Sequence, residues 1–175
     1  MTDTAALPHL AATPAQLLYP DLAVELATTR RVLERVPDDK LAWKPHDKSM
    51  SLSRLATHVA ELPSFGAMIL GTDEMDWATF DYKPREFTST AQIVELFDEQ
   101  AAGMTAAVEA MGWSMVDQPW TMRMGDHVIL NGKKGILLRT LGLSHMAHHR
   151  GQLSVYLRLV GAVVPGVYGP SADES

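Results

Sequence analysis

Three histidines fall within five residues of the segment S-H-M-A-H-H-R-G-Q-L, residues 144–153. Positions i and i+4 of an α-helix lie one turn apart on the same face, so His145 and His149 can direct both imidazoles at one point. His148 is about 100° around the helix axis from His149 and points elsewhere, as expected of a residue that supports a site or lies in an interface. The spacing therefore predicts a pair of metal ligands, and the alternative is a buried hydrogen-bond network.

The face that carries His145 and His149 is otherwise mostly apolar, which indicates that the pair lies on the buried side of its helix. A buried polar group without a hydrogen-bond partner costs about 1 to 3 kcal/mol, so two buried imidazoles require partners. Gln152 can supply one, by hydrogen bonding to a ligand or to a water molecule. The residues expected on this face are Leu138, Leu141 or Gly142, Gln152 and Tyr156.

A third histidine occupies an apolar stripe earlier in the chain. His58 falls at helical spacing in this stripe, where an aliphatic side chain is expected. If the two helices face each other, His58 joins His145 and His149, and three neutral histidines leave a metal with an open position, as in catalytic centres. Such a metal can ionise water or activate a substrate. The alternative for His58 is a core residue whose ring nitrogens are hydrogen bonded. The other members of the stripe are Leu55, Leu62, Phe65 and Ile69.

Two charged residues adjoin these histidines. Glu61 lies about one turn after His58 and can orient a ligand, act as a general base toward metal-bound water, or form an exposed ion pair. Arg150 directly follows His149 and is expected to form a structural ion pair rather than to anchor a substrate. Gly151 is expected to let another helix approach closely.

Hydrophobic periodicity predicts an all-α protein with four long helices. They are expected at about residues 14–36, 51–69, 89–111 and 136–160. Pro63 should bend the second helix near its middle, and Gly161 should end the fourth. A four-helix bundle forming a single domain over residues 1–175 is the most economical arrangement. The expected N-terminal caps are Thr13, Ser49 or Ser51, and Ser89 or Thr90.

The sequence between the third and fourth helices changes character. Alternating residues and turn signals over about residues 117–134 predict a short β-hairpin, with Gly125-Asp126 as its turn and Asn131-Gly132 closing it. The polar stretch between the second and third helices is expected to cross over between distant helix ends.

Composition narrows the classes of function. The 175 residues carry a formal net charge of −6 and no long basic cluster, which disfavours a nucleic-acid partner. The absence of cysteine restricts metal ligands to His, Asp and Glu and removes thiol nucleophiles. We find neither a signal peptide nor a sufficiently long apolar run to span a membrane, so a cytoplasmic protein without membrane attachment is expected.

Several segments together resemble the DinB family of metal-dependent proteins, also called DinB-like or YfiT-like. They are H-V-A-E-L at 58–62, the H-x-x-H-H-R-G-Q-L pattern at 145–153 and the ending P-G-V-Y-G-P-S-A-D-E at 165–174. The similarity runs from about Leu17 to Glu174 and includes P-D-D-K-L-A-W-K-P-H-D-K-S-M-S-L-S-R-L at 37–55.

This resemblance implies an up-down-down-up four-helix bundle that binds a divalent cation through His58, His145 and His149. Zinc or nickel is the implied metal, with iron or manganese as alternatives. The related superfamily includes thiol-dependent S-transferases and a mycothiol-dependent isomerase, which implies transfer of a low-molecular-weight thiol, whereas an open three-histidine metal site alone favours hydrolysis. The resemblance also implies a homodimer, with an unknown small molecule as substrate. The competing class is a non-catalytic metal-binding or stress-response protein.

Overall fold

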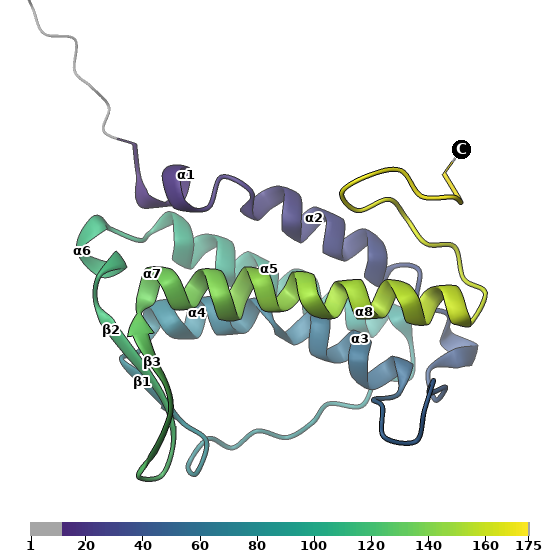
Figure 1. Ribbon diagram of the computed structural model, residues 1–175, viewed down its shortest axis with the longest axis horizontal. Helices are drawn as coiled ribbons and strands as arrows, with labels where there is room; N and C mark the ends of the chain where they lie inside the picture. Colours follow the sequence, from purple (N-terminus) through teal and green to yellow (C-terminus); the bar gives the residue numbers. More distant parts are fainter. Residues whose placement is uncertain (1–11, 175) are drawn as a thin grey trace, which may run out of the picture.

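The computed structural model describes residues 12–174, and these form a predominantly helical protein with a small three-stranded sheet (Figure 1). His9, to which no role is assigned, lies outside the described residues. The helical elements are α1 Pro14–Leu18, α2 Leu22–Leu33, the short 3₁₀ turn η1 Asp38–Lys40, α3 Leu52–Glu61, α4 Pro63–Gly71, α5 Thr90–Glu109, α6 Trp113–Val116, α7 Lys134–Leu137, η2 Leu138–Ser144 and α8 His145–Leu159. The strands are β1 Glu74–Asp76, β2 Pro119–Met124 and β3 His127–Lys133.

The prediction of one continuous helix over residues 14–36 is wrong. Thr13 begins α1 as predicted, with its side chain accepting a hydrogen bond from the Gln16 amide. Tyr19 then leaves the helical conformation, with φ −134° and ψ 46°, because the ring of Pro20 disfavours helical geometry in the preceding residue. The helix resumes as α2 and ends at Leu33, so Val36 is buried in the loop that follows.

The second predicted helix is divided at Pro63, where a bend is expected. Ser51 caps α3 by accepting a hydrogen bond from the Arg54 amide. Leu62, between α3 and α4, keeps helical angles of φ −58° and ψ −35°, so α4 continues in nearly the same direction (Figure 1). Pro63 supplies no amide hydrogen, which interrupts the hydrogen bonding without reversing the chain.

The third and fourth predicted helices lie close to their expected ranges. Ser89 caps α5 by accepting a hydrogen bond from the Gln92 amide. The last helical stretch begins two residues earlier than predicted, at Lys134, and its middle part, η2, is a π-helix. Gly161, with φ +77°, follows its end, as expected of a glycine at a helix C-terminus. The π-helix leads directly into His145, and such segments often occur at functional sites.

The predicted hairpin over 117–134 is confirmed as β2 and β3, which pair antiparallel around Gly125 at φ +58°. Asn131-Gly132 does not close the hairpin but lies within β3, where Gly132 faces Leu137. The sheet also contains β1, which was not predicted; it pairs parallel with β2 in the order β1-β2-β3.

Two hydrophobic clusters hold these elements together. In the larger one α2 and α3 each pack against both α5 and α8. The smaller cluster joins α4, α7 and the sheet. Figure 1 shows the connection from β1 to α5 running back along the length of α4 and α3. Within residues 12–174 we find no helix with the length and hydropathy needed to span a bilayer. The members of the smaller cluster are Ile69, Met75, Trp120, Met122 and Leu137.

Candidate metal site

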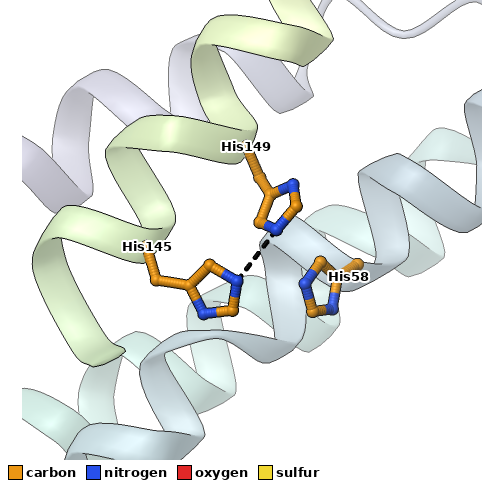
Figure 2. Close-up of side chains that lie close together, drawn as sticks. All are labelled: His58, His145 and His149. Carbon is orange, nitrogen blue, oxygen red and sulfur yellow. Dashed lines mark hydrogen bonds between the residues drawn. The ribbon is translucent and has the colours of Figure 1, made fainter. Parts of the chain in front are cut away.

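Packing of α3 against α8 brings together the three histidines that the sequence predicts as metal ligands. His58, His145 and His149 each place one ring nitrogen so that all three atoms lie within 4.8 Å of one another. Figure 2 shows the imidazoles pointing toward one another from the two helices. Nitrogens bound tetrahedrally at about 2.0–2.1 Å from zinc would be about 3.3 Å apart. Small side-chain rotations are therefore sufficient to bring the three nitrogens to a common cation.

A hydrogen bond on its far side fixes the orientation of His149. Its Nδ1 lies 2.7 Å from Oε1 of Gln152, so Nδ1–H donates to the amide oxygen and Nε2 carries the lone pair. This Nε2 lies 2.9 Å from Nε2 of His145, as the dashed line in Figure 2 shows. Histidines that bind metals usually donate their other ring N–H to an acceptor in this way, which sets the tautomer. The arrangement directs the free nitrogen of His149 toward the other two rings.

Gln152 is in turn oriented by His148. Its amide nitrogen lies 3.1 Å from Nε2 of His148, to which it donates a hydrogen bond. The sequence predicted Gln152 on the inward face, but its side chain is exposed and supports His149 from the solvent side. His148 is exposed as well, consistent with its predicted supporting role rather than ligation.

Replacing Gln152 by alanine is expected to lower metal affinity about 10- to 100-fold, because His149 loses the acceptor that fixes its tautomer. Gln152→Glu keeps an oxygen acceptor and should retain most of the affinity. Competition with a zinc-binding indicator measures the effect, and Gln118→Ala, which removes an exposed glutamine elsewhere, is the matched control. Equal affinities for Gln152→Ala and Gln118→Ala would show that the hydrogen bond has no such role.

The surroundings of the histidines favour their neutral forms. Burial, followed by the proximity of His149, His145 and Arg54, lowers the pKa of His58 to about 4. Burial also lowers the pKa values of His145 and His149. Within residues 12–174 the ring nitrogens of His58 have no hydrogen-bond partner, which argues against the alternative of a hydrogen-bonded core histidine. Three imidazoles that are neutral at pH 7 fit a divalent cation.

Glu61 lies beside the cluster in a small polar network. Its Oε2 accepts a hydrogen bond from Tyr82 at 3.0 Å and forms an ion pair with Arg54 at 3.4 Å. Nη2 of Arg54 also donates to the Tyr82 hydroxyl at 2.7 Å. Of the three roles predicted for Glu61 the ion pair is present, but the carboxylate is 14% exposed rather than fully solvated. Arg54, one turn before His58, and Tyr82 were not predicted as part of the site.

A cavity of about 670 Å³ opens beside the cluster and is lined by His58, His145 and Glu61. Its volume falls in the range of small-molecule sites. Trp77, Phe80 and Tyr82, from the connection after β1, form part of its wall. The histidine cluster therefore borders a cavity that can hold a small molecule between the helices and the connection after β1.

Arg150 lies in the core on the other side of α8, with 1% of its side chain exposed. Its guanidinium pairs with the Glu25 carboxylate at 2.7 Å and donates to Oγ1 of Thr29 at 2.9 Å and to the Tyr168 hydroxyl. The predicted structural ion pair is confirmed. Gly151 does not permit a close helix approach as predicted, since it is exposed and no atom lies within 4 Å of the position of an added Cβ.

Comparison with known proteins places this chain in a family. The uncharacterized protein YrdA of Bacillus subtilis (strain 168) is 27% identical over 150 residues, covering 86% of this chain and 85% of YrdA. The crystal structure of a DinB-like protein from Bacillus cereus ATCC 10987 has a TM-score of 0.64 at 20% identity and covers 86% of this chain and 95% of its own.

A second DinB-like protein, YjoA from Bacillus subtilis, has a TM-score of 0.65 at 18% identity and covers 90% of this chain and 98% of its own. At these identities the two crystal structures establish the fold alone. The model of the DinB family matches residues 10–175, which is nearly the whole sequence. The chain therefore belongs to the DinB family.

Proposed function

We propose that the protein binds one divalent cation through His58, His145 and His149. The observation that carries the proposal is the convergence of three ring nitrogens, from two separate helices, within 4.8 Å of one another. Zinc or nickel suits this donor set, and iron or manganese is also compatible with it. We also propose that the long helices follow the up-down-down-up order that the family resemblance implies.

A catalytic role follows from the open side of the site. A divalent cation at this position would supply Lewis-acid activation of water or of a low-molecular-weight thiol, as in a hydrolase or a thiol S-transferase. Glu61 would accept the proton that the nucleophile loses, since its carboxylate lines the same cavity. Arg54 and Tyr82 hold that carboxylate in place. The half-buried Phe65 and Met68 restrict water in the rest of the cavity.

The second candidate is a non-catalytic metal-binding or stress-response protein. The hydrogen bonds that orient His149, and those that orient Glu61, would serve a purely structural ion equally well. The cavity beside the histidines favours the catalytic candidate, because a structural metal is usually enclosed by protein ligands.

Loading the protein with Co²⁺ separates the two candidates, because the visible spectrum of this ion reports its ligands. We expect addition of azide or cysteamine to change the spectrum, since three histidines leave a position for an external ligand. Glu61→Gln should bind Co²⁺ as the wild type does, because Glu61 is proposed as a proton acceptor and not as a metal ligand. A Co²⁺ spectrum that neither azide nor cysteamine alters would favour the non-catalytic candidate.

A further inference from the structure

The side of the cavity formed by α3 and α4 changes from charged to apolar side chains along its length. Six residues of α3 and α4 line the cavity, and apart from Ser64 they recur at intervals of three or four positions, so these five share one face. The helical angles at Leu62 keep this face continuous, and the stretch covers about 20 Å of helix. In chain order the five are Arg54, His58, Glu61, Phe65 and Met68. A cation, a metal ligand, a carboxylate and two apolar side chains thus follow one another along the cavity.

The end of the cavity nearest the sheet is apolar. Phe65 and Met68 pack against the smaller hydrophobic cluster, as do Trp77 and Leu141 from other elements. Leu141 precedes His145 by four residues, whereas Phe65 follows His58. The α3–α4 side and the η2–α8 side of the cavity therefore both run from the histidines toward the same apolar end. Met122 of β2 also lines the cavity there.

The opposite end carries more positive than negative charge. Arg54, Lys83 and Arg85 line the cavity together with two carboxylates, Glu61 and Asp81. Arg54 pairs with Glu61, and Lys83 pairs with Asp81 at 3.1 Å. The formal sum of these five side chains is +1, since there are three cations and two anions.

Arg85 is the cation of this group that remains available. It is exposed and makes no ion pair with any of residues 12–174. It also borders a neighbouring cavity that contains Asp38, Asp39 and Glu86, but none of these carboxylates pairs with it. A free guanidinium can hold a carboxylate through two parallel hydrogen bonds.

We infer that the cavity binds an elongated organic carboxylate with an apolar body. The body lies against Phe65, Met68 and Leu141, the carboxylate is held by Arg85, and the part between them passes His58 and His145. This inference rests on the proposed function for the role of the histidines. It adds the class of ligand, which the metal site alone does not specify.

Calorimetry with 6-phenylhexanoate and its uncharged amide tests the inference on zinc-loaded and metal-free protein. The acid is expected to bind zinc-loaded protein about tenfold more tightly than the amide, because only the acid pairs with Arg85. Arg85→Gln should abolish this preference and leave amide binding unchanged. Arg35→Gln, which removes an exposed arginine away from the cavity, should change neither.

Variants at the apolar end test the other half of the inference. Met68→Gln is expected to weaken the acid and the amide by the same factor, because the two share the body that contacts this side chain. Met124→Gln, at a residue that is 51% exposed and outside the cavity, is the matched control and should have no effect. Unchanged thermal unfolding midpoints would verify that each variant is folded.

Three results would overturn the inference. They are equal binding of acid and amide by the wild type, a preference for the acid that survives Arg85→Gln, and unchanged binding by Met68→Gln. A preference that survives Arg85→Gln but requires zinc would place the anion on the metal, which leaves the proposed metal site intact. Conversely, a protein that retains no zinc but prefers the acid through Arg85 would contradict the proposed function and support the ligand class.

Discussion

Replacing His58, His145 or His149 by alanine is expected to reduce the metal content of the purified protein from about one divalent ion per chain to a small fraction of that value. Three protein ligands is the usual number for a catalytic zinc site, so losing any one leaves only two imidazoles to hold the ion. Elemental analysis after extensive dialysis measures the occupancy. The effect should be similar for all three variants, although His58 lies on α3 and the other two lie on α8.

His148→Ala is the matched control for these variants. His148 adjoins His149 in sequence, but its side chain is exposed and lies outside the three-histidine cluster. Its loss should leave occupancy near the wild-type value and reduce affinity only through Gln152. If all four alanine variants retained the same amount of metal, the assignment of the ligands would be wrong.

The dependence of affinity on pH provides a second measurement on the wild type. Lowered pKa values keep the three imidazoles unprotonated at pH 7, so protons compete little with the cation there. Below about pH 6.5, the ordinary pKa of histidine, we expect apparent affinity to fall first as His145 and His149 titrate. His58 should contribute only near its pKa of about 4. An affinity that is the same at pH 7 and pH 4 would contradict ligation by histidine.

The clustering of the three histidines could be predicted because helical spacing determines which residues share a face. The i, i+4 relation of His145 and His149 holds within α8, and His58 stands among apolar residues of α3. Both observations require only local geometry and the tendency of apolar faces to be buried. Caps at Thr13, Ser51 and Ser89 were also predictable from local sequence, since each side chain accepts a hydrogen bond from the amide three residues later.

The polar surroundings of the site could not be predicted because they depend on a long connection. Tyr82 reaches Glu61 across 21 positions of sequence, and no periodicity relates an irregular segment to a helix face. The three-residue strand β1 is too short to show an alternating pattern, and its pairing with β2 joins distant segments. The ligand class inferred for the cavity likewise depends on Arg85, a residue of the same connection.

Two departures within the helices have local causes. Pro20 interrupts the first predicted helix, although the apolar spacing on either side of it continues in phase. The π-helix η2 alters the helical phase just before His145, since each π-turn contains more residues than an α-turn. Leu138 is consequently buried in the larger core cluster, while Leu141 lines the cavity.

Arg150→Met is expected to lower the free energy of unfolding by about 3–5 kcal/mol, the usual effect of removing one partner of a buried ion pair. Arg150 is 1% exposed and Glu25 is 12% exposed, so the carboxylate would be left without its counterion in the core. Thr29 and Tyr168 would lose hydrogen bonds as well. Urea denaturation with metal removed by a chelator measures the change without a contribution from ligation.

The comparison with an exposed pair shows why burial determines this effect. Arg158→Met removes the partner of Asp173, but the Arg158 side chain is 51% exposed, so little change in the free energy of unfolding is expected. Adding Glu25→Leu to Arg150→Met should recover part of the lost stability, because the unpaired carboxylate is then removed too. A loss of less than about 1 kcal/mol for Arg150→Met would mean that the pair contributes no more than a surface one.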